Sequence, residues 1–282
     1  MILRSLREHQ DMGSRAALLV KGGLAVVKAS NLLLALASFA VYAFLFTWQF
    51  AIIIVGMLVI HECGHLACMK HYDMKTRGIY VIPLVGAAAV AEENFPSRRA
   101  EATVALAGPL TGAVLAAGTG LAYFASHNGA LAAAAAWMAL INLFNLLPVV
   151  PLDGGRVVKS ITCSIGSRTG LAVLIAGMLL GAVLAFTADL WIFVILIPLG
   201  LLDFLHDRHQ ASQAGRRDSR QAGRHARPET SADIPAAKLP LSPRASWAAF
   251  AFYAGLAMLL WLFMLAMGHQ PGAVAATHAL QG

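Results

Sequence analysis

The sequence predicts an all-α polytopic membrane protein with about seven transmembrane helices. Apolar residues make up 59% of the 282 residues and charged residues only 12%, whereas soluble domains carry about 25% charged residues. Several stretches of 18 or more residues contain no Asp, Glu, Lys or Arg, which is typical of transmembrane helices. The basic residues are also grouped between these stretches rather than spread evenly.

The chain begins with a segment, 1–30, that we expect to be amphipathic and cytoplasmic. Its mildly apolar part is interrupted by Lys21 and Lys28, so it lacks the continuous apolar core of a signal peptide. Basic and apolar residues combined in this way favour a helix that lies on the membrane surface.

Residues 31–205 are predicted to form a core of six spans. Three blocks in it are almost free of charged residues: 29–60, 102–152 and 169–202. Each block is too long for one span of about 20 residues and fits two helices joined by a tight turn. Polar residues mark a turn at 126–129 and another at 187–189. The turn in the first block is faint, near 47–50, and the count falls to six spans if that block is one tilted helix.

The remaining residues are predicted to form a linker, one helix and a tail. Segment 206–245 is rich in Arg, Gln, Ser, Ala and Pro and has few large apolar residues, so we expect a basic, flexible cytoplasmic linker. Residues 246–267 are apolar and fit a seventh transmembrane helix. Residues 268–282 follow as a short tail.

All 21 Lys and Arg residues fall on one side of a seven-span arrangement. By the positive-inside rule this side is the cytoplasm, which places the amino terminus inside. The net charge of +7 is therefore a topology signal, and we expect no nucleic-acid partner. The compact architecture suggests the plasma (inner) membrane of a bacterium or archaeon.

Three ionisable residues, His61, Glu62 and His65, interrupt the second predicted helix. Such groups are costly inside a membrane, so they indicate function. Residues four apart lie on one face of a helix, so the two histidines can bind one metal ion. Glu62 is near enough to accept a proton from a metal-activated water molecule. This HExxH arrangement is typical of zinc hydrolases.

A catalytic zinc ion takes three protein ligands and leaves one position open, so a third ligand is required. The acidic candidates are Glu92, Glu93, Glu101 and Asp153. Taken alone, Asp153 before two glycines is typical of a turn or a helix end. Beside the HExxH motif it is favoured as a ligand, because both motifs approach the same depth on the cytoplasmic side.

Three separated motifs resemble, in order, those of the site-2 protease family of intramembrane metalloproteases. They are "HECGH" at 61–65, "AGPLTG" at 107–112 and "NLLPVVPLDGG" at 145–155. The resemblance covers residues 50–160. The family often carries a PDZ or CBS domain, and neither fits here, so no regulatory partner is implied.

The resemblance implies one zinc ion per chain, held by His61, His65 and Asp153, with Glu62 as the general base. It also implies cleavage of a transmembrane segment of another membrane protein within the lipid bilayer. The active site is then expected toward the cytoplasmic side.

Two further features could serve hydrolysis of a helical substrate. Residues 79–90 begin with β-prone residues, and in the family this region resembles a membrane-dipping β-hairpin near the active site. Such a hairpin would offer a strand edge to an unwound substrate, and the alternative is a short helix or loop packed on the bundle. Asn145 either donates to the oxyanion of a tetrahedral intermediate or satisfies an open backbone group before Pro148.

The leading hypothesis is a zinc-dependent intramembrane endopeptidase. A second is a membrane zincin of another family that uses one of the three glutamates as third ligand. A third is a membrane metal transporter, although the outer halves of the spans lack the ionisable residues of a through-path. A fourth is a catalytically inactive family member that acts as a scaffold.

Overall fold

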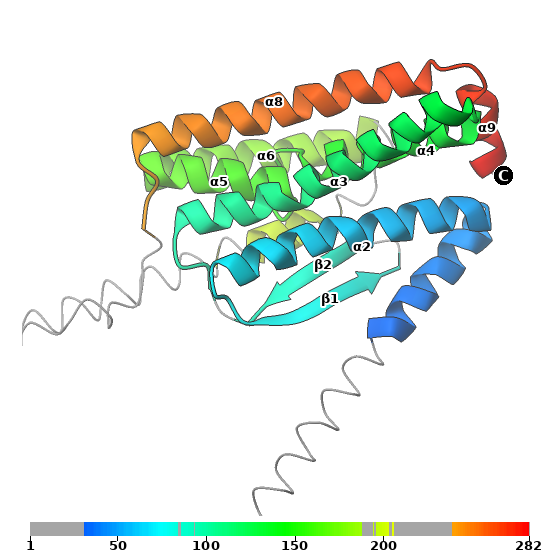
Figure 1. Cartoon of the computed structure of the whole chain (residues 1–282). Helices are drawn as coiled ribbons and strands as arrows, with labels where there is room; N and C mark the ends of the chain where they lie inside the picture. The colour runs from blue at the N-terminus through cyan, green and yellow to red at the C-terminus, as the bar shows by residue number, and fades with distance from the viewer. Residues whose placement is uncertain are drawn as a thin grey trace, which may run out of the picture.

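A computed structural model shows the chain as a bundle of long helices with a two-stranded sheet along one side (Figure 1). The structure describes residues 31–83, 86–92, 94–187, 194, 196–202, 205 and 239–281. The predicted amino-terminal segment, 1–30, and residues 206–238 of the predicted linker lie outside the described residues. In Figure 1, α8 runs along one side of the bundle, and α2 with the sheet lies on the opposite side.

The first charge-free block forms two helices, as its faint turn signal predicts. The first helix is Asn31–Leu45, and α2 (Trp48–His71) begins shortly after it. The Thr47 hydroxyl caps α2, because it accepts a hydrogen bond from the backbone N–H of Phe50 at 3.3 Å. The break at Thr47 therefore lies within the predicted turn, 47–50.

An antiparallel hairpin follows α2 directly. It consists of β1 (Thr76–Ile82) and β2 (Gly86–Ala91), and it packs against α2. The Ser38 hydroxyl of the first helix donates to the carbonyl of Val81 in β1 at 3.2 Å. The predicted hairpin at 79–90 is thus confirmed as a two-stranded sheet, and its depth in the membrane stays a prediction.

The second pair of helices is α3 (Arg98–Ser126) and α4 (Gly129–Asn145). Polar residues make the turn between them. His127 has a left-handed conformation with φ of 52° after the last turn of α3. The Asn128 side chain then caps α4 by accepting a hydrogen bond from a backbone N–H. The predicted turn at 126–129 is confirmed.

A folded connection, 146–152, joins α4 to α5 (Asp153–Ile165) and packs back on the first turn of α5. A Cβ on Gly154 would collide with the carbonyl group of Leu146, and a Cβ on Gly155 would collide with the backbone of the connection. Two consecutive residues without side chains are therefore needed here. Their close approach fixes where α5 begins.

Two further long helices are α6 (Ser167–Thr187) and α8 (Pro243–Gly268). Helix α6 ends where the turn at 187–189 is predicted. Helix α8 confirms the predicted helix at 246–267 and begins three residues earlier, after a Ser242 cap.

The predicted tail, 268–282, contains one more short helix, α9 (Ala273–Gln281). It packs against α4 and approaches the start of α2. There the Thr47 hydroxyl donates to the carbonyl of Leu280 at 2.5 Å. The end of the chain is therefore anchored to the amino end of the helix that carries the HExxH motif. The predicted domain boundaries themselves stay predictions.

Among the residues that the structure describes, three helices, α2, α3 and α8, are long and apolar enough to cross a membrane. The remaining apolar helical stretches found in the described residues are shorter: Asn31–Leu45, Gly129–Asn145 and, within α6, Arg168–Val183. A helix of 17 residues such as α4 spans only about 25 Å, less than a hydrocarbon core of about 30 Å. The mostly helical architecture with a small two-stranded sheet is confirmed, whereas about seven spans are not confirmed by the described residues.

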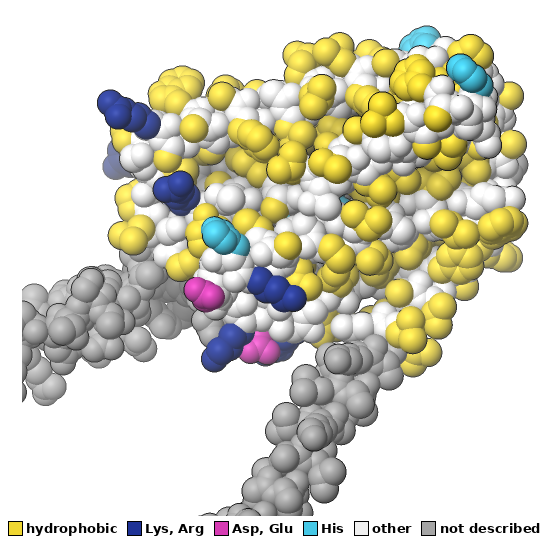
Figure 2. Space-filling model, in the orientation of Figure 1, with side chains coloured by type: hydrophobic (Ala, Val, Ile, Leu, Met, Phe, Trp, Pro, Cys, Tyr) yellow, Lys and Arg dark blue, Asp and Glu magenta, His cyan; other side chains and the backbone are white. Residues whose placement is uncertain are grey.

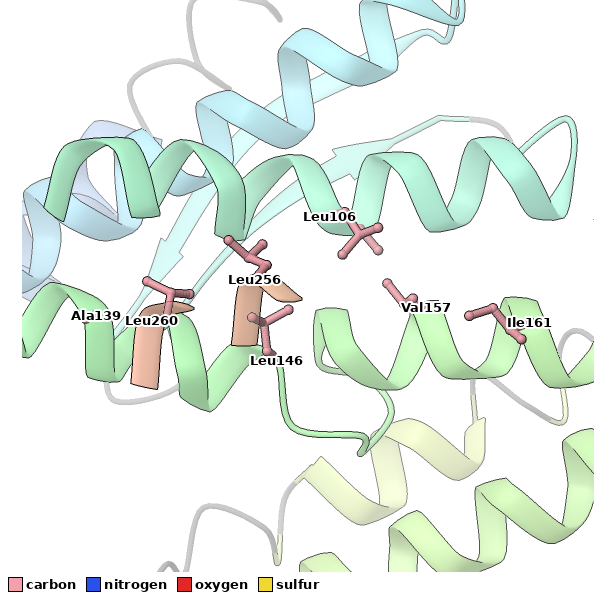
Figure 3. Close-up of a cluster of buried hydrophobic side chains, with 8 residues drawn as sticks. Leu106, Ala139, Leu146, Val157, Ile161, Leu256 and Leu260 are labelled. Carbon is pink, nitrogen blue, oxygen red and sulfur yellow. The ribbon is translucent and has the colours of Figure 1, made fainter. Parts of the chain in front are cut away.

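Apolar side chains dominate both the interior and the outer surface of the bundle. Figure 2 shows many hydrophobic side chains exposed on the face in view, as expected for a surface that faces lipid. Inside, the largest cluster joins α3, α4, α5 and α8 (Figure 3). Leu106 of α3, Val157 of α5 and Leu260 of α8 belong to it.

A buried ion pair links the amino end of α3 to α5. Glu101 contacts the Nζ atom of Lys159 at 3.4 Å and a guanidinium nitrogen of Arg98 at 2.9 Å. The side chains of Glu101 and Lys159 are each only 3% exposed. A buried charge that loses its partner costs roughly 3 to 5 kcal/mol, so this pair constrains how α5 sits on α3.

We expect Lys159→Met to lower the free energy of unfolding by less than the roughly 3 to 5 kcal/mol of a fully unpaired buried charge, because Glu101 loses one cation and keeps Arg98. Thermal unfolding of the purified protein in detergent measures this loss. The control is Lys70→Met, which removes an exposed lysine at the end of α2. Equal unfolding temperatures for the two variants would contradict the prediction.

Candidate metal centre

The structure brings His61, His65 and Asp153 together at one buried point between α2 and α5. The two histidines lie one helical turn apart, and Asp153 is the first residue of α5. The Nε2 atoms of the histidines are 3.1 Å apart. They lie 2.9 Å (His61) and 3.2 Å (His65) from the same carboxylate oxygen, Oδ2, of Asp153. One ligand atom from each residue can therefore reach a single ion.

The other ring nitrogen of each histidine faces an oxygen acceptor. His65 Nδ1 lies 2.7 Å from the carbonyl oxygen of Val104 in α3, and His61 Nδ1 lies 3.1 Å from Oδ1 of Asn142 in α4. The Asn142 amide is oriented, because its Nδ2 group donates to the carbonyl of Met138 at 2.8 Å. An oxygen acceptor requires the proton on Nδ1 of each ring. This is the arrangement that holds metal-binding histidines in the correct tautomer.

With both protons on Nδ1, the two Nε2 lone pairs and the Asp153 carboxylate all point at one place. Three acceptor groups that converge without a hydrogen between them repel each other unless a cation lies among them. Two imidazoles and one carboxylate are also a known ligand set for catalytic zinc, which leaves the fourth position open. The residues present therefore fit a zinc ion.

Close packing of α3 on α2 makes this convergence possible. A Cβ on Gly108 would collide with the imidazole rings of both His61 and His65. In the same way, a Cβ on Gly64 of α2 would collide with the carbonyl oxygen of Ala107 in α3. Small residues permit such close approach of membrane helices. The "AGPLTG" stretch thus leaves space for the two imidazoles.

Glu62 lies beside the two histidines and is connected to the hairpin. Its Oε2 atom accepts the backbone N–H of Ala89 in β2 at 2.6 Å. The side chain is buried, as are the two histidines. Because the N–H of Ala89 is directed to Glu62 and not to β1, the free edge of β2 faces this carboxylate. Ala87 and Ala91 share that direction, since the hydrogen-bonding direction alternates along a strand.

Asn145 lies at the last residue of α4 and is half-buried. Within the described part of the chain, its amide forms no hydrogen bond. The asparagine that contacts a histidine is Asn142, one turn earlier, which the sequence interpretation did not single out. The sequence does contain a signal for Asn142. It is an amide side chain in a charge-free helix, and a buried amide needs a hydrogen-bond partner.

The other acidic candidates do not join the cluster where the structure describes them. Glu101 is engaged with Lys159, as described above. Glu92 is exposed and lies 3.9 Å from Arg77. Glu93 lies outside the described residues. Of the described candidates, the fold brings Asp153 alone to the histidines.

Comparison with known proteins finds similarity to zinc metalloproteases. The model of peptidase family M50 matches residues 49–129. Zinc metalloprotease MJ0392 of Methanocaldococcus jannaschii is 26% identical over 162 residues, covering 50% of this chain and 46% of the relative. The putative zinc metalloprotease Rip3 of Mycobacterium tuberculosis is 29% identical over 162 residues, covering 47% and 41%.

Stage IV sporulation protein FB of Bacillus subtilis is 26% identical over 165 residues, which cover 54% of this chain and 57% of the relative. The chain therefore spans about half the length of the curated relatives it matches. The family match covers α2, the hairpin and α3, which include both histidines and Glu62.

We expect the wild-type protein, purified in detergent without chelators, to contain close to one zinc ion per chain. Asp153→Ala should lose most of it, because two imidazoles alone leave the site one ligand short. Elemental analysis of the purified proteins measures the zinc content. Glu92→Ala is the control and should keep its zinc. Full zinc in Asp153→Ala would exclude Asp153 as a ligand.

Removing the partner of His61 should weaken metal binding without removing a ligand. We expect Asn142→Leu to lower the zinc affinity about 10- to 100-fold, which is the usual cost of losing a partner of a metal-binding histidine. Competition with a fluorescent zinc chelator measures the affinity. Asn145→Leu makes the same substitution in the same helix and should leave the zinc affinity unchanged. Equal affinities for both variants would contradict the role of Asn142.

Proposed function

Because the chain belongs to peptidase family M50, the site-2 protease family, we propose that it is a zinc-dependent endopeptidase acting on membrane proteins. It hydrolyses peptide bonds within or beside transmembrane segments of its substrates. The observation that carries this proposal is the convergence of His61, His65 and Asp153 beside Glu62, with three of the four residues on a helix long and apolar enough to span a membrane.

We assign His61, His65 and Asp153 as the ligands of one zinc ion per chain. Zinc in such a site supplies Lewis acidity, which activates a water molecule and polarises the carbonyl group of the substrate. Glu62 accepts the proton of the attacking water and delivers it to the leaving amine. Asn145 is the last residue of α4, directly before the connection to α5. We assign its side-chain amide as a hydrogen-bond donor to the developing oxyanion.

The edge of β2 is the proposed binding site for the unwound substrate. A peptide bond inside a helix is shielded, because its carbonyl group is already hydrogen-bonded, so the substrate must first unwind. An extended segment beside β2 would pair with the outward-facing backbone groups of Ala87 and Ala91. The hydrogen bond between Ala89 and Glu62 supports this placement, since it sets the general base at the edge where the substrate strand would lie.

The topology belongs to the same proposal. The protein would be a multi-pass protein of the plasma (inner) membrane with its amino terminus in the cytoplasm. The active site would open toward the cytoplasmic side, where the basic residues cluster. The metal-transport and other-zincin alternatives gain no support from the described geometry, in which Glu92 and Glu101 are engaged elsewhere.

We expect Glu62→Gln to abolish proteolysis while close to one zinc ion per chain is retained, because the amide cannot accept the proton of water. The loss in rate should be about 100-fold or more, as for removal of a general base. The assay compares new peptide ends by mass spectrometry after native-host membranes are incubated with purified wild-type or variant protein.

Glu92→Gln is the matched control, since it changes an exposed glutamate outside the cluster, and it should cleave like the wild type. The same preparations are tested for zinc uptake into sealed vesicles. Uptake that survives in Glu62→Gln, together with no cleavage by the wild type, would replace the protease proposal with metal transport.

A further inference from the structure

We propose that a groove between α3 and the first half of α8 binds an anionic phospholipid. The groove has a volume of about 430 Å³, which is within the usual range for sites that hold a small ligand. One acyl chain lies along it, and the lipid phosphate lies at its basic end, next to Arg99 and Arg244.

The groove is elongated and apolar. Its α3 side is a single stripe that begins at Arg99 and ends at Leu110, a distance of about 16 Å along the helix axis. Alanines of α8, together with Leu241 and Phe252, form the other wall. Past Arg99, the lining contains no charged side chain. A long, narrow, apolar slot with one polar end has the shape and polarity of a single lipid chain.

The groove lies beside the first half of α8, because the buried side chains of this helix lie in its second half. The buried residues of α8 are Leu256, Leu260 and Met267. Earlier in the helix, the residues that face α3 are small, such as Ala245 and Ala248, so they leave the space between the helices unfilled. In a membrane such a space is filled by lipid, because open apolar slots lose dispersion contacts.

The end of the groove is positively charged. Arg99 lines it, and Arg244 immediately precedes the lining residue Ala245. Both side chains are exposed, and in the described part of the chain neither pairs with an acidic side chain. Figure 2 shows dark blue side chains at the end of the molecule where α3 and α8 begin. Two unpaired guanidinium groups match the charge of a phosphate.

An aromatic residue places this basic end at headgroup depth. Trp247 of α8, three residues after Arg244, is 70% exposed. Tryptophan gathers at the boundary between the hydrocarbon core and the headgroups, and basic side chains next to that boundary attract anionic lipids. Charge and depth together therefore favour an anionic phospholipid over a zwitterionic one and over a transmembrane segment of a protein.

The test is native mass spectrometry of the full-length protein in a non-ionic detergent, titrated with phosphatidylglycerol or phosphatidylcholine. We expect one phosphatidylglycerol to bind more tightly than phosphatidylcholine. Arg99→Gln and Arg244→Gln should each weaken its binding about fivefold, as expected for one basic residue near a membrane surface. Arg168→Gln removes an exposed arginine of α6 outside the groove and should not change binding.

A second pair of variants tests the slot itself and does not depend on the arginines. Ala248→Phe fills the groove and should displace the lipid, whereas Ala254→Phe puts the same side chain on an exposed position outside the lining. Equal binding of the two lipids, or equal lipid binding by the two phenylalanine variants, would overturn the proposal. If Ala248→Phe left lipid binding unchanged but blocked proteolysis, the lipid proposal would be wrong. The groove would then be assigned as a binding site for a segment of the protein substrate.

Discussion

The rest of the structure depends on holding three electron-pair donors at one point inside an apolar bundle. The two Nε2 atoms and the Asp153 carboxylate repel one another and are buried from water, so the fold must fix each of them from outside. For the two histidines it does so through hydrogen bonds to the ring nitrogen that faces away from the cluster. Val104 of α3 holds one imidazole, and Asn142 of α4 holds the other. Four helices therefore contribute to a site whose ligands lie on only two of them.

Close helix packing is the second requirement, because these hydrogen bonds are short and cross between helices. Gly108 and Gly112 of α3 lie directly against the imidazoles and the Asn142 amide, where a Cβ would collide. The outward-facing nitrogen of each imidazole thus has an acceptor inside the bundle, which helps the fold to tolerate the two histidines at membrane depth.

Helix α8 lies beyond the part of the chain that matches the family, yet it contacts the connection that positions Asp153. The Tyr253 hydroxyl donates to the carbonyl of Leu146 at 2.7 Å, and Gly154 packs against that same carbonyl group. The later residues Leu256 and Leu260 join the apolar cluster of Figure 3. Helix α8 therefore supports the connection that positions Asp153 through Tyr253, and its first half lines the groove proposed for a lipid.

The sequence by itself determined the features that depend on near neighbours in the chain. The helical period places His61 and His65 on one face of α2, and local polar residues determine the break at 126–129. The sequence only favoured the hairpin over a short helix or loop. Only the tertiary structure decided that Asn142 supports His61, since that contact spans 81 residues, and that α4 is short for a full span. The contact between His61 and Asp153 spans 92 residues, and the sequence could only favour it. Distant pairs are selected by how helices pack, which composition and periodicity do not encode.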